Sequence, residues 1–376
     1  MQIGRLVLQK GGYKAFIPDP FPPKDSISFD NELVELLGKA NLNLGKLDGI
    51  TQTLKQLDFF IFMYVRKEAA LSSEIEGTQA TMIDSIEAQL KISKELPKDV
   101  NDILHYIDAM NFGLKRLESL PLSLRLIQEV HKVLLTKARS EVFAYPGEFR
   151  KTPNWIGGTS PTNARYVPPP VYEMNSALSD LEKFLHAKNT LSPLLKTGLV
   201  HAQFETIHPF VDGNGRTGRL LVTFYLCQQK VLERPVLYLS EFFKRNREQY
   251  FDLLQNYHDK GDVISWLKFF LTGVIEVADS AIDTSKKINI LREQDIKKIQ
   301  NSSRSSKSAL MVLDKLYDLP IINVAKIQEW TGFSRASAND LVDKLVSLNI
   351  LQQREKNVSY GRTFEYVEYL QVFTKP

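Results

Sequence analysis

Cysteine is almost absent from this chain of 376 residues, because Cys227 is the only one. A single cysteine excludes an internal disulfide and any metal cluster held by several thiolates. It lies in the run LLVTFYLCQQ, where a small buried apolar residue is the favoured interpretation. The start of the chain has no basic-then-apolar signal pattern. We therefore expect a reducing, cytoplasmic setting.

Long apolar runs, a strong net charge and a Walker-type phosphate loop are also missing. The most apolar window, LKFFLTGVIEVA, is interrupted by Lys268 and Glu276 and is too short to span a bilayer. The net charge of +4 is a mild excess, which by itself predicts neither a nucleic-acid nor a membrane partner. No GxxxxGK[ST] pattern occurs. With 43% hydrophobic and 24% charged residues, the chain has the composition of a globular protein of two or three domains.

The spacing of apolar residues predicts a mainly helical fold. Residues 1–29 are rich in Pro and Gly, and we expect them to form an arm lying on the body. Helical spacing follows over residues 31–94, 100–136 and 171–283. Residues 141–170 combine aromatic and β-branched residues with two adjacent glycines and a Pro run, which predicts a short hairpin or flap.

The last stretch of the chain has the pattern of a winged helix-turn-helix. From Ser308 a helix is followed by a second helix that ends at Gly332, a third that begins near Ser334, and a strand-like segment that turns at Gly361. We expect a linker helix with a polar exit to precede this module. The predicted organisation is an N-terminal helical region (1–99), a helical core (100–283), a linker helix (284–307) and a winged helix (308–376).

The predicted winged helix is electrically neutral. It contains eight Lys and Arg against eight Asp and Glu residues. Phosphate contacts supply most of the non-specific affinity for DNA, and Asp340 and Asp343 lie on the helix that would face the phosphates. A docking module or a homodimerisation module is therefore the favoured interpretation, and DNA binding stays open as the alternative.

One stretch, HPFVDGNGRTGRLL over residues 208–221, has the pattern of an anion site. A helix is expected to end near His208, because Pro209 follows. Glycine at 213 and 215 permits positive φ, so Gly213-Asn214-Gly215 can turn successive N–H groups toward one point. The next helix begins there, and its N-terminus adds positive potential at the same point.

The charged residues of this stretch favour a polyphosphate and its metal. Arg216 and Arg219 share one helical face, and cations at a helix N-terminus are unfavourable unless an anion is bound there. Asp212 is placed to hold a divalent cation that bridges phosphates, as Mg²⁺ does with one or two carboxylates. His208 is the side chain in reach that normally titrates near neutral pH, and it suits a general base.

HPFVDGNGRTGR resembles the signature of the Fic family, His-Pro-Phe-x-Asp-Gly-Asn-Gly-Arg-x-x-Arg, with every fixed position present. The resemblance implies an α-helical Fic core over roughly residues 100–280 and the transfer of AMP from ATP to a Ser, Thr or Tyr hydroxyl of a target protein, with pyrophosphate leaving. His208 would take the proton and Asp212 would position Mg²⁺. The Gly213–Gly215 amides and Asn214 would hold the α- and β-phosphates of ATP. Arg216 would support the phosphates, and Arg219 would hold the γ-phosphate.

A second stretch, Ser72-Ser73-Glu74-Ile75-Glu76-Gly77, resembles the inhibitory motif of Fic proteins. Ser72 and Glu76 are four residues apart and share a helical face. The resemblance implies that Glu76 pairs with Arg219 and forces ATP into a non-productive pose. The simpler interpretation is an exposed acid at a helix end capped by Gly77. The same Glu could instead align water for the removal of AMP.

Two further assignments concern the edges of the expected site. Ile156, Gly157 and Gly158 of the flap are expected to dock the target segment by strand addition, as the family resemblance implies. The ring of Tyr250 either stacks on adenine or belongs to the core. The favoured function is an autoinhibited protein adenylyltransferase. The alternatives are a de-AMPylase, another nucleotidyl or phosphoryl transferase, and a DNA-binding regulator that uses the core as a nucleotide sensor.

Overall fold

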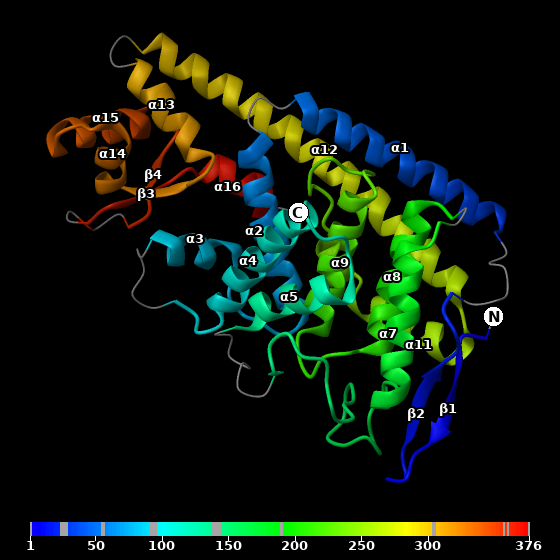
Figure 1. Cartoon of the computed structure of the whole chain (residues 1–376). Coiled ribbons are helices and arrows are strands. Elements are labelled where there is room, and N and C mark those ends of the chain that lie inside the picture. The colour runs from blue at the N-terminus through cyan, green and yellow to red at the C-terminus, as the bar shows by residue number, and fades with distance from the viewer. Residues whose placement is uncertain are drawn as a thin grey trace.

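The structure, a computed structural model, is mainly helical, as expected (Figure 1). It describes residues 2–22, 29–53, 57–90, 96–136, 144–188, 191–302, 306–355, 358 and 361–374. None of its helices is long and apolar enough to cross a membrane, within these described residues.

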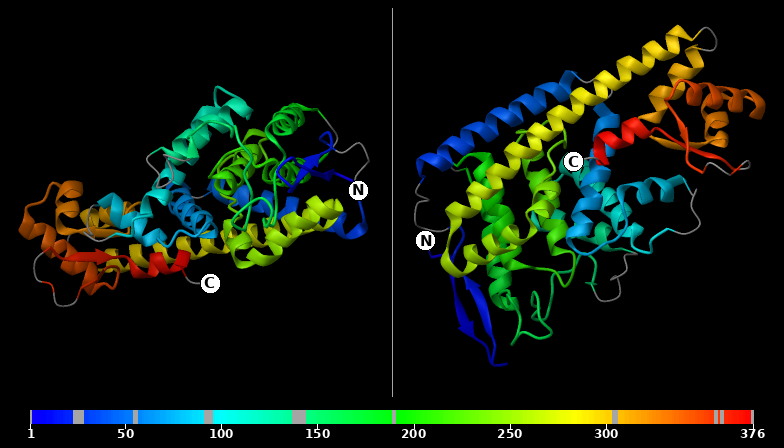
Figure 2. Two further views of the ribbon diagram at one scale, coloured as in Figure 1. Left: turned by 90° about the horizontal axis from the view of Figure 1, so that it is seen from below. Right: turned by 180° about the vertical axis from the view of Figure 1, so that it is seen from behind.

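Two long helices lie side by side along the molecule in all three views (Figures 1 and 2). They are α1 (Asn31–Thr53) and α12 (Val263–Asn301). Helix α12 runs for 39 residues without a break, so the predicted linker helix (284–307) begins as a direct continuation of the last helix of the core. Its second half buries Ile288, Leu291 and Ile299, and this apolar stripe makes it part of the packed body. Part of the predicted polar exit NSSRSSKS (301–308), at 303–305, lies outside the described residues.

The centre of the fold is built around α8. The central helices are α4 (Val100–Leu117), α5 (Leu124–Leu135), α7 (Val171–His186), α8 (Pro193–Ile207) and α9 (Asn214–Gln228). Every residue of α8 after Pro193 is buried, because α7, α9, α11 and α12 surround it. Trp266 of α12 donates its indole N–H to the carbonyl of Gly198 at 2.8 Å, which fixes α12 against the middle of α8.

Shorter helices close the two sides of this centre. They are α2 (Leu57–Ile75), α3 (Met82–Leu90), α10 (Ser240–Arg245) and α11 (Arg247–Lys260). Helix α2 packs against α4 and α10 and points its C-terminal end toward the start of α9. Within the stretch of expected helical spacing, α10 and α11 are separate helices, because the chain leaves the helical conformation at Asn246, where φ is −108°.

Two β elements lie near residues 144–170. The predicted N-terminal arm forms an antiparallel hairpin of β1 (Gly4–Leu8) and β2 (Lys14–Pro18). The N–H of Phe16 in β2 donates to the carbonyl of Val167 at 2.9 Å. The expected flap hairpin is reduced to one antiparallel bridge between Ile156 and Tyr166, and residues 141–143 of its start lie outside the described residues.

The C-terminal module has the expected helix-turn-helix. Its elements are α13 (Ser306–Leu316), β3 (Ile321–Asn323), α14 (Val324–Thr331), α15 (Arg335–Ser347), β4 (Gln352–Gln353), β5 (Thr363–Glu365) and α16 (Val367–Thr374). Helix α14 ends at Gly332, where φ is +70°, and Ser334 caps α15 by accepting the N–H of Ser337 at 3.3 Å. The sequence therefore located this turn correctly.

The remainder of the module differs from the expectation. The sheet has a third strand, in the order β3-β5-β4, and the strand-like pattern after Tyr366 is helix α16. The ring of Phe373 in α16 packs edge-on against Tyr64 of α2, with ring centroids 5.7 Å apart. Burial against α2 and α12 overrides the β propensity of this segment. Part of the predicted wing, at 356–357 and 359–360, lies outside the described residues.

The packing of α4 on α9 generates a first prediction. A Cβ at Gly113 would overlap the ring of Phe224, so Gly113→Ala should destabilise the fold by about 1–3 kcal/mol. The matched control is Gly38→Ala on α1, where a Cβ meets nothing within 4 Å and helix propensity predicts a gain of up to ~1 kcal/mol. Urea unfolding measures both, and shifts in the same direction would contradict the described packing.

Candidate active site

The connection between α8 and α9 brings the residues of the HPFVDGNGR stretch to one point. Helix α8 ends at His208, which adopts the left-handed conformation with φ +48° and ψ +60°. Gly213 begins the next helix with φ +79°, a conformation that glycine adopts without strain. The predicted turn between two helices is therefore present, with a histidine at one end and a helix N-terminus at the other.

The side chain of Asn214 holds this turn together. Its carbonyl oxygen accepts the N–H of Phe210 at 2.8 Å, and its amide donates to the carbonyl of Phe210 at 2.8 Å. The residue is 2% exposed. Asn214 therefore shapes the turn, and its contact with phosphates stays a prediction.

Two residues far away in sequence also support the turn. His131 of α5 accepts the N–H of Gly147 at Nδ1 (2.9 Å), so its Nε2 carries the proton and donates to the carbonyl of Asp212 at 2.9 Å. Arg150 donates from Nε to the carbonyl of His208 at 2.9 Å and from Nη2 to that of Pro169 at 2.6 Å. Neither residue could be identified from the sequence, because no local pattern marks a contact across 58 or 81 positions.

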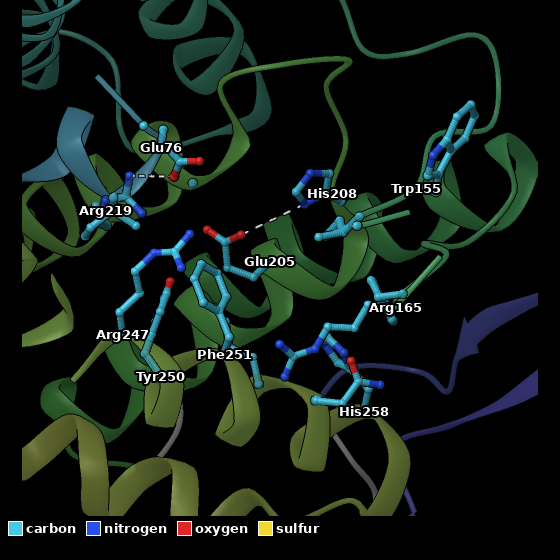
Figure 3. Close-up of a pocket in the computed structure, with 18 of the residues that line it drawn as sticks. Glu76, Trp155, Arg165, Glu205, His208, Arg219, Arg247, Tyr250, Phe251 and His258 are labelled. Carbon is cyan, nitrogen blue, oxygen red and sulfur yellow. Dashed lines mark hydrogen bonds and ion pairs between the residues drawn. The ribbon is translucent and has the colours of Figure 1, made fainter. Parts of the chain in front are cut away.

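His208 is neutral at physiological pH. Burial lowers the pKa of its imidazole to about 4, and the nearby Arg150 cation lowers it further in the same direction. Its side chain is 18% exposed, and it lines a cavity of about 660 Å³ (Figure 3). A neutral imidazole at the rim of a cavity can accept a proton, as a general base must.

Arg219 is the cation at the opposite end of this cavity. It donates from Nε to the hydroxyl of Ser72 (2.8 Å), and from Nη2 to the carbonyl of Ser72 (2.9 Å) and to Glu76 Oε1 (2.8 Å). Burial opposes the charge, but Glu76 overcomes it and raises the pKa of Arg219 above its ordinary value. The predicted pairing of Glu76 with Arg219 is therefore what the structure shows (Figure 3).

The carboxylate of Glu76 also lies against the turn itself. A Cβ at Gly215 would overlap Glu76 Oε1, so the acid occupies the space directly above the first residues of α9. Gly77 follows with φ +96° and ends the α2 segment, as the capping interpretation expected. The carboxylate of Glu76 therefore occupies the position at which the sequence predicts a bound anion.

Asp212 and Arg216 lie beside the turn and outside the cavity lining. The Asp212 carboxylate is 45% exposed, accepts the N–H of Gly213 at 2.7 Å and lies 3.8 Å from Arg216. Arg216 is buried between this carboxylate and Asp102 of α4, at 3.9 Å. The described residues contain no group of three or more potential metal-binding side chains. A single half-exposed carboxylate nevertheless fits Mg²⁺, which takes most of its ligands from water and phosphate.

The remaining wall of the cavity comes from α11 and residues 155–166. The ring of Tyr250 is 1% exposed and stacks on Phe243 with centroids 4.5 Å apart, while its hydroxyl hydrogen-bonds His201 Nε2 at 2.9 Å. Of the two interpretations of Tyr250, this burial favours the core. Phe251, Arg247 and His258 also line the cavity, and the sequence did not indicate them.

The residues 155–166 close the cavity from the other side. Ile156 and Gly157 line it, and Arg165 forms an ion pair with Asp252 of α11 at 2.6 Å. Gly158 does not line the cavity; it packs against the backbone of Asn163, where a Cβ would meet the Asn163 amide oxygen at 2.7 Å. Trp155 lies at the rim and is 41% exposed (Figure 3).

Comparisons with known proteins assign this site to a family. The sequence profile described as "Fic/DOC family N-terminal" matches residues 34–115, and the "Fic/DOC family" profile matches residues 121–226. This chain belongs to the Fic/DOC family. The second profile contains the whole α8–α9 turn, and the first contains Ser72, Glu76 and Gly77.

Curated relatives resemble part of the chain. It is 28% identical over 201 residues to "Protein adenylyltransferase Fic" of Drosophila grimshawi, a match that covers 52% of this chain and 38% of that protein. It is 25% identical over 208 residues to "Probable protein adenylyltransferase aq_aa38" of Aquifex aeolicus, covering 55% of this chain and 59% of that protein. The chain thus spans less than two thirds of either relative.

Solved structures show the same fold. A Fic family protein from Desulfovibrio desulfuricans superimposes with a TM-score of 0.59 at 16% identity, covering 92% of this chain and 98% of that one. A Fic-domain-containing signaling protein from Bacteroides thetaiotaomicron gives a TM-score of 0.52 at 20% identity over 68% of this chain and 97% of that one.

The Asn214 clamp generates a second prediction. Asn214→Ala leaves the buried N–H of Phe210 without its acceptor and removes one donor from its carbonyl, and should cost roughly 2 kcal/mol of unfolding free energy. Asn41→Ala on α1 is the control, because it removes one exposed amide contact and should change stability by less than ~0.5 kcal/mol. Equal stability of the two variants would refute the clamp.

The buried histidines generate a third prediction. Burial lowers the pKa to about 4 in His131, His201 and His208 and to about 3 in His258. In the unfolded chain each of these histidines binds a proton near its ordinary pKa of 6.5, whereas in the folded chain it stays unprotonated to a lower pH. The unfolding free energy should therefore fall as the pH drops below about 6.5, by up to ~1.4 kcal/mol per pH unit for each histidine.

Denaturant unfolding across this pH range measures the effect. His258→Gln can keep the hydrogen bond to Thr206 but cannot titrate, so the pH slope should decrease. If His258→Gln leaves the pH slope of the unfolding free energy unchanged, the neutral state of this buried histidine is contradicted.

Proposed function

We propose that this protein is an autoinhibited protein adenylyltransferase, which transfers AMP from ATP to a Ser, Thr or Tyr hydroxyl of a target protein and of itself. The observation that carries the proposal is one cavity with a neutral His208 at its rim and Arg219 with the Gly213–Gly215 turn at its far end. The names of the curated relatives agree with this activity.

The side chains divide the reaction among them. His208 takes the proton of the target hydroxyl, whose oxygen then attacks the α-phosphorus while the bond to pyrophosphate breaks. The backbone N–H groups at the start of α9 and its helix dipole hold the phosphates, and Arg219 holds the terminal one. Asp212 would hold Mg²⁺, which neutralises phosphate charge when bound. Arg216 supports the carboxylate of Asp212 from the buried side.

Autoinhibition follows from the position of Glu76. Its carboxylate takes the hydrogen bond from Arg219 that a terminal phosphate needs, and it occupies the space over Gly215. A polyphosphate and this carboxylate repel each other and cannot share the same donors. ATP therefore binds in a shifted pose until α2 moves its C-terminal end away or Glu76 is removed.

Target docking is proposed to use the segment of Ile156, Gly157 and Gly158. The backbone of Ile156 is bonded to Tyr166 through both its N–H (2.8 Å) and its carbonyl. Gly157 and Gly158 turn the chain directly after Ile156, with φ of +69° and +72°, so the edge offered to a target is short and lies at the bridge itself. An extended target segment can add there, with the exposed Trp155 ring as an apolar anchor beside His208.

Removal of AMP is a second candidate activity, because Glu76 faces the same cavity as His208 and could align a water molecule. The regulator hypothesis has less support. Asp343 on α15 pairs with Arg362 at 3.4 Å, so an acid and a cation neutralise each other on the helix that would face DNA.

A fourth prediction tests the proposal. The full chain is incubated with labelled ATP, Mg²⁺ and cell lysate, and labelled protein is measured. Glu76→Gly should raise the rate several-fold because Arg219 is released, and His208→Ala in that background should abolish transfer. Glu74→Gly is the matched control, since Glu74 is two residues away and pairs with Lys244 instead of the arginine.

Three outcomes separate the alternatives. An unchanged rate in Glu76→Gly would refute autoinhibition. Transfer that survives His208→Ala would refute the proposed chemistry. A salt-dependent shift of DNA with no label on protein would favour the regulator instead.

A further inference from the structure

The last turn of α8 contains two buried polar atoms without a hydrogen-bond partner among the described residues. They are Oε1 of Glu205 and Nδ1 of His208, and the His208 ring also interacts with the backbone of Glu205. The other carboxyl oxygen of Glu205 lies 3.9 Å from His208 Nδ1, and the two side chains are only 10% and 18% exposed (Figure 3). Buried polar atoms are nearly always paired, so a small rotation that completes this contact is favourable.

We propose that Glu205 is a positioning residue for His208: its carboxylate accepts the Nδ1–H of the imidazole and thereby directs the Nε2 lone pair toward the target hydroxyl. The inference rests on the proposed function. Neither the Fic signature nor the sequence analysis includes Glu205, which precedes the signature by three residues.

The tautomer of His208 explains why the acid matters. A neutral imidazole has one N–H and one lone pair, and only the lone pair can take a proton. An ionised Glu205 only accepts, so it places the ring hydrogen on Nδ1 and leaves Nε2 ready. A protonated Glu205 donates to Nδ1 and leaves the hydrogen on Nε2, where the ring cannot act as a base. A wrong tautomer of this kind is costly in other histidine-dependent enzymes.

A glycine on α9 makes room for this acid. A Cβ at Gly218 would overlap Glu205 Oε1, so any larger residue there would displace the carboxyl group. Gly218 occupies a position that the family signature leaves open, between Arg216 and Arg219. The carbonyl of Gly218 also contacts His201 Nδ1 at 3.0 Å, which fixes α9 at this point.

The surroundings of the pair set the pH at which the switch occurs. Burial raises the pKa of Glu205 to about 8, while Arg219 lowers it and Glu76 raises it. The charged and titratable groups near the pair come from α2, the 150 region, the turn, α9 and α11: Glu76, Arg150, Asp212, Arg219, Arg247, Tyr250 and His258. Above this pKa the ionised Glu205 selects the active tautomer, so the rate of transfer should rise with pH.

No proton is transferred to Glu205 during the transfer of AMP. The hydroxyl proton passes to His208 Nε2, the hydroxyl oxygen bonds to the α-phosphorus, and the bond to pyrophosphate breaks. The imidazolium that results is stabilised by the Glu205 carboxylate at Nδ1. His208 then returns the proton from Nε2 to water.

The fifth prediction uses Glu205→Gln in the Glu76→Gly background, because glutamine keeps the shape and cannot ionise. Steady-state transfer to protein should show kcat reduced about tenfold or more, with the KM for ATP within about twofold of the parent. The rise of the rate with pH should disappear, and in the Glu76→Gly parent its midpoint should lie below that of the unaltered chain, because Glu76 raises the pKa of Glu205. Thermal unfolding should show a Tm equal to or above that of the parent, because a buried acid is removed. Glu35→Gln on the exposed side of α1 is the control and should match the parent throughout.

A purely structural role of Glu205 predicts a lower Tm and an unchanged pH profile, and that result would overturn the inference. An unchanged kcat would overturn it as well. The proposed function fails separately, if transfer survives His208→Ala.

A measurement that needs no activity gives an independent answer. The full chain is prepared with nitrogen-labelled histidine, and the ring signals of His208 are assigned by their loss in His208→Ala. These signals should move with a midpoint near pH 8 in the parent, when Glu205 ionises, and should stay fixed there in Glu205→Gln. If the His208 ring signals of the parent do not move around pH 8, the pairing of Glu205 with His208 is refuted.

Discussion

The buried ion pair between Arg219 and Glu76 is the interaction on which the arrangement of the site depends. A guanidinium that is 4% exposed requires an anion, because an unpaired charge in this environment is strongly unfavourable. Ser72 and Glu76 satisfy it from the end of α2, which is a different part of the chain from the α8–α9 turn. The same requirement makes the site ready for a phosphate once the acid leaves. In the proposed function, inhibition by Glu76 and binding of the nucleotide both satisfy this same requirement of Arg219 for an anion.

Burial sets the acid-base properties of the remaining site. It keeps His208 neutral, and it raises the pKa of Glu205 to about 8, so that this acid ionises only in that pH range. His131 and Arg150 hold the backbone of the turn in place from two separate segments. The chemistry therefore resides in few side chains, while the surrounding helices fix where those side chains point.

The local motifs could be predicted from sequence because each is encoded within a few residues. The left-handed end of α8 at His208, the glycine start of α9 and the turn at Gly332 all follow from local conformational preferences. The pairing of Glu76 with Arg219 spans 143 positions and followed only from family resemblance. Physical reasoning on one sequence has no access to contacts of that separation.

The features that the sequence did not reveal have the same origin. The role of Asn214 toward Phe210 is visible only when the turn is closed. Residues 284–301 were expected to form a linker helix because their apolar stripe is narrow, yet Ile288 and Leu291 are buried in the fold. Glu205 was overlooked since a lone acid in an apolar helix gives no signal until its neighbours are known. Tertiary packing, and not local propensity, decided each case.

A crystal structure of Glu76→Gly soaked with a non-hydrolysable ATP analogue and Mg²⁺ tests the central claim most directly. The account predicts phosphates on the N–H groups of Gly213 to Gly215, the terminal phosphate on Arg219, and the His208 ring facing the α-phosphorus. A nucleotide bound elsewhere, or a His208 ring turned into the interior beneath an empty turn, would contradict it.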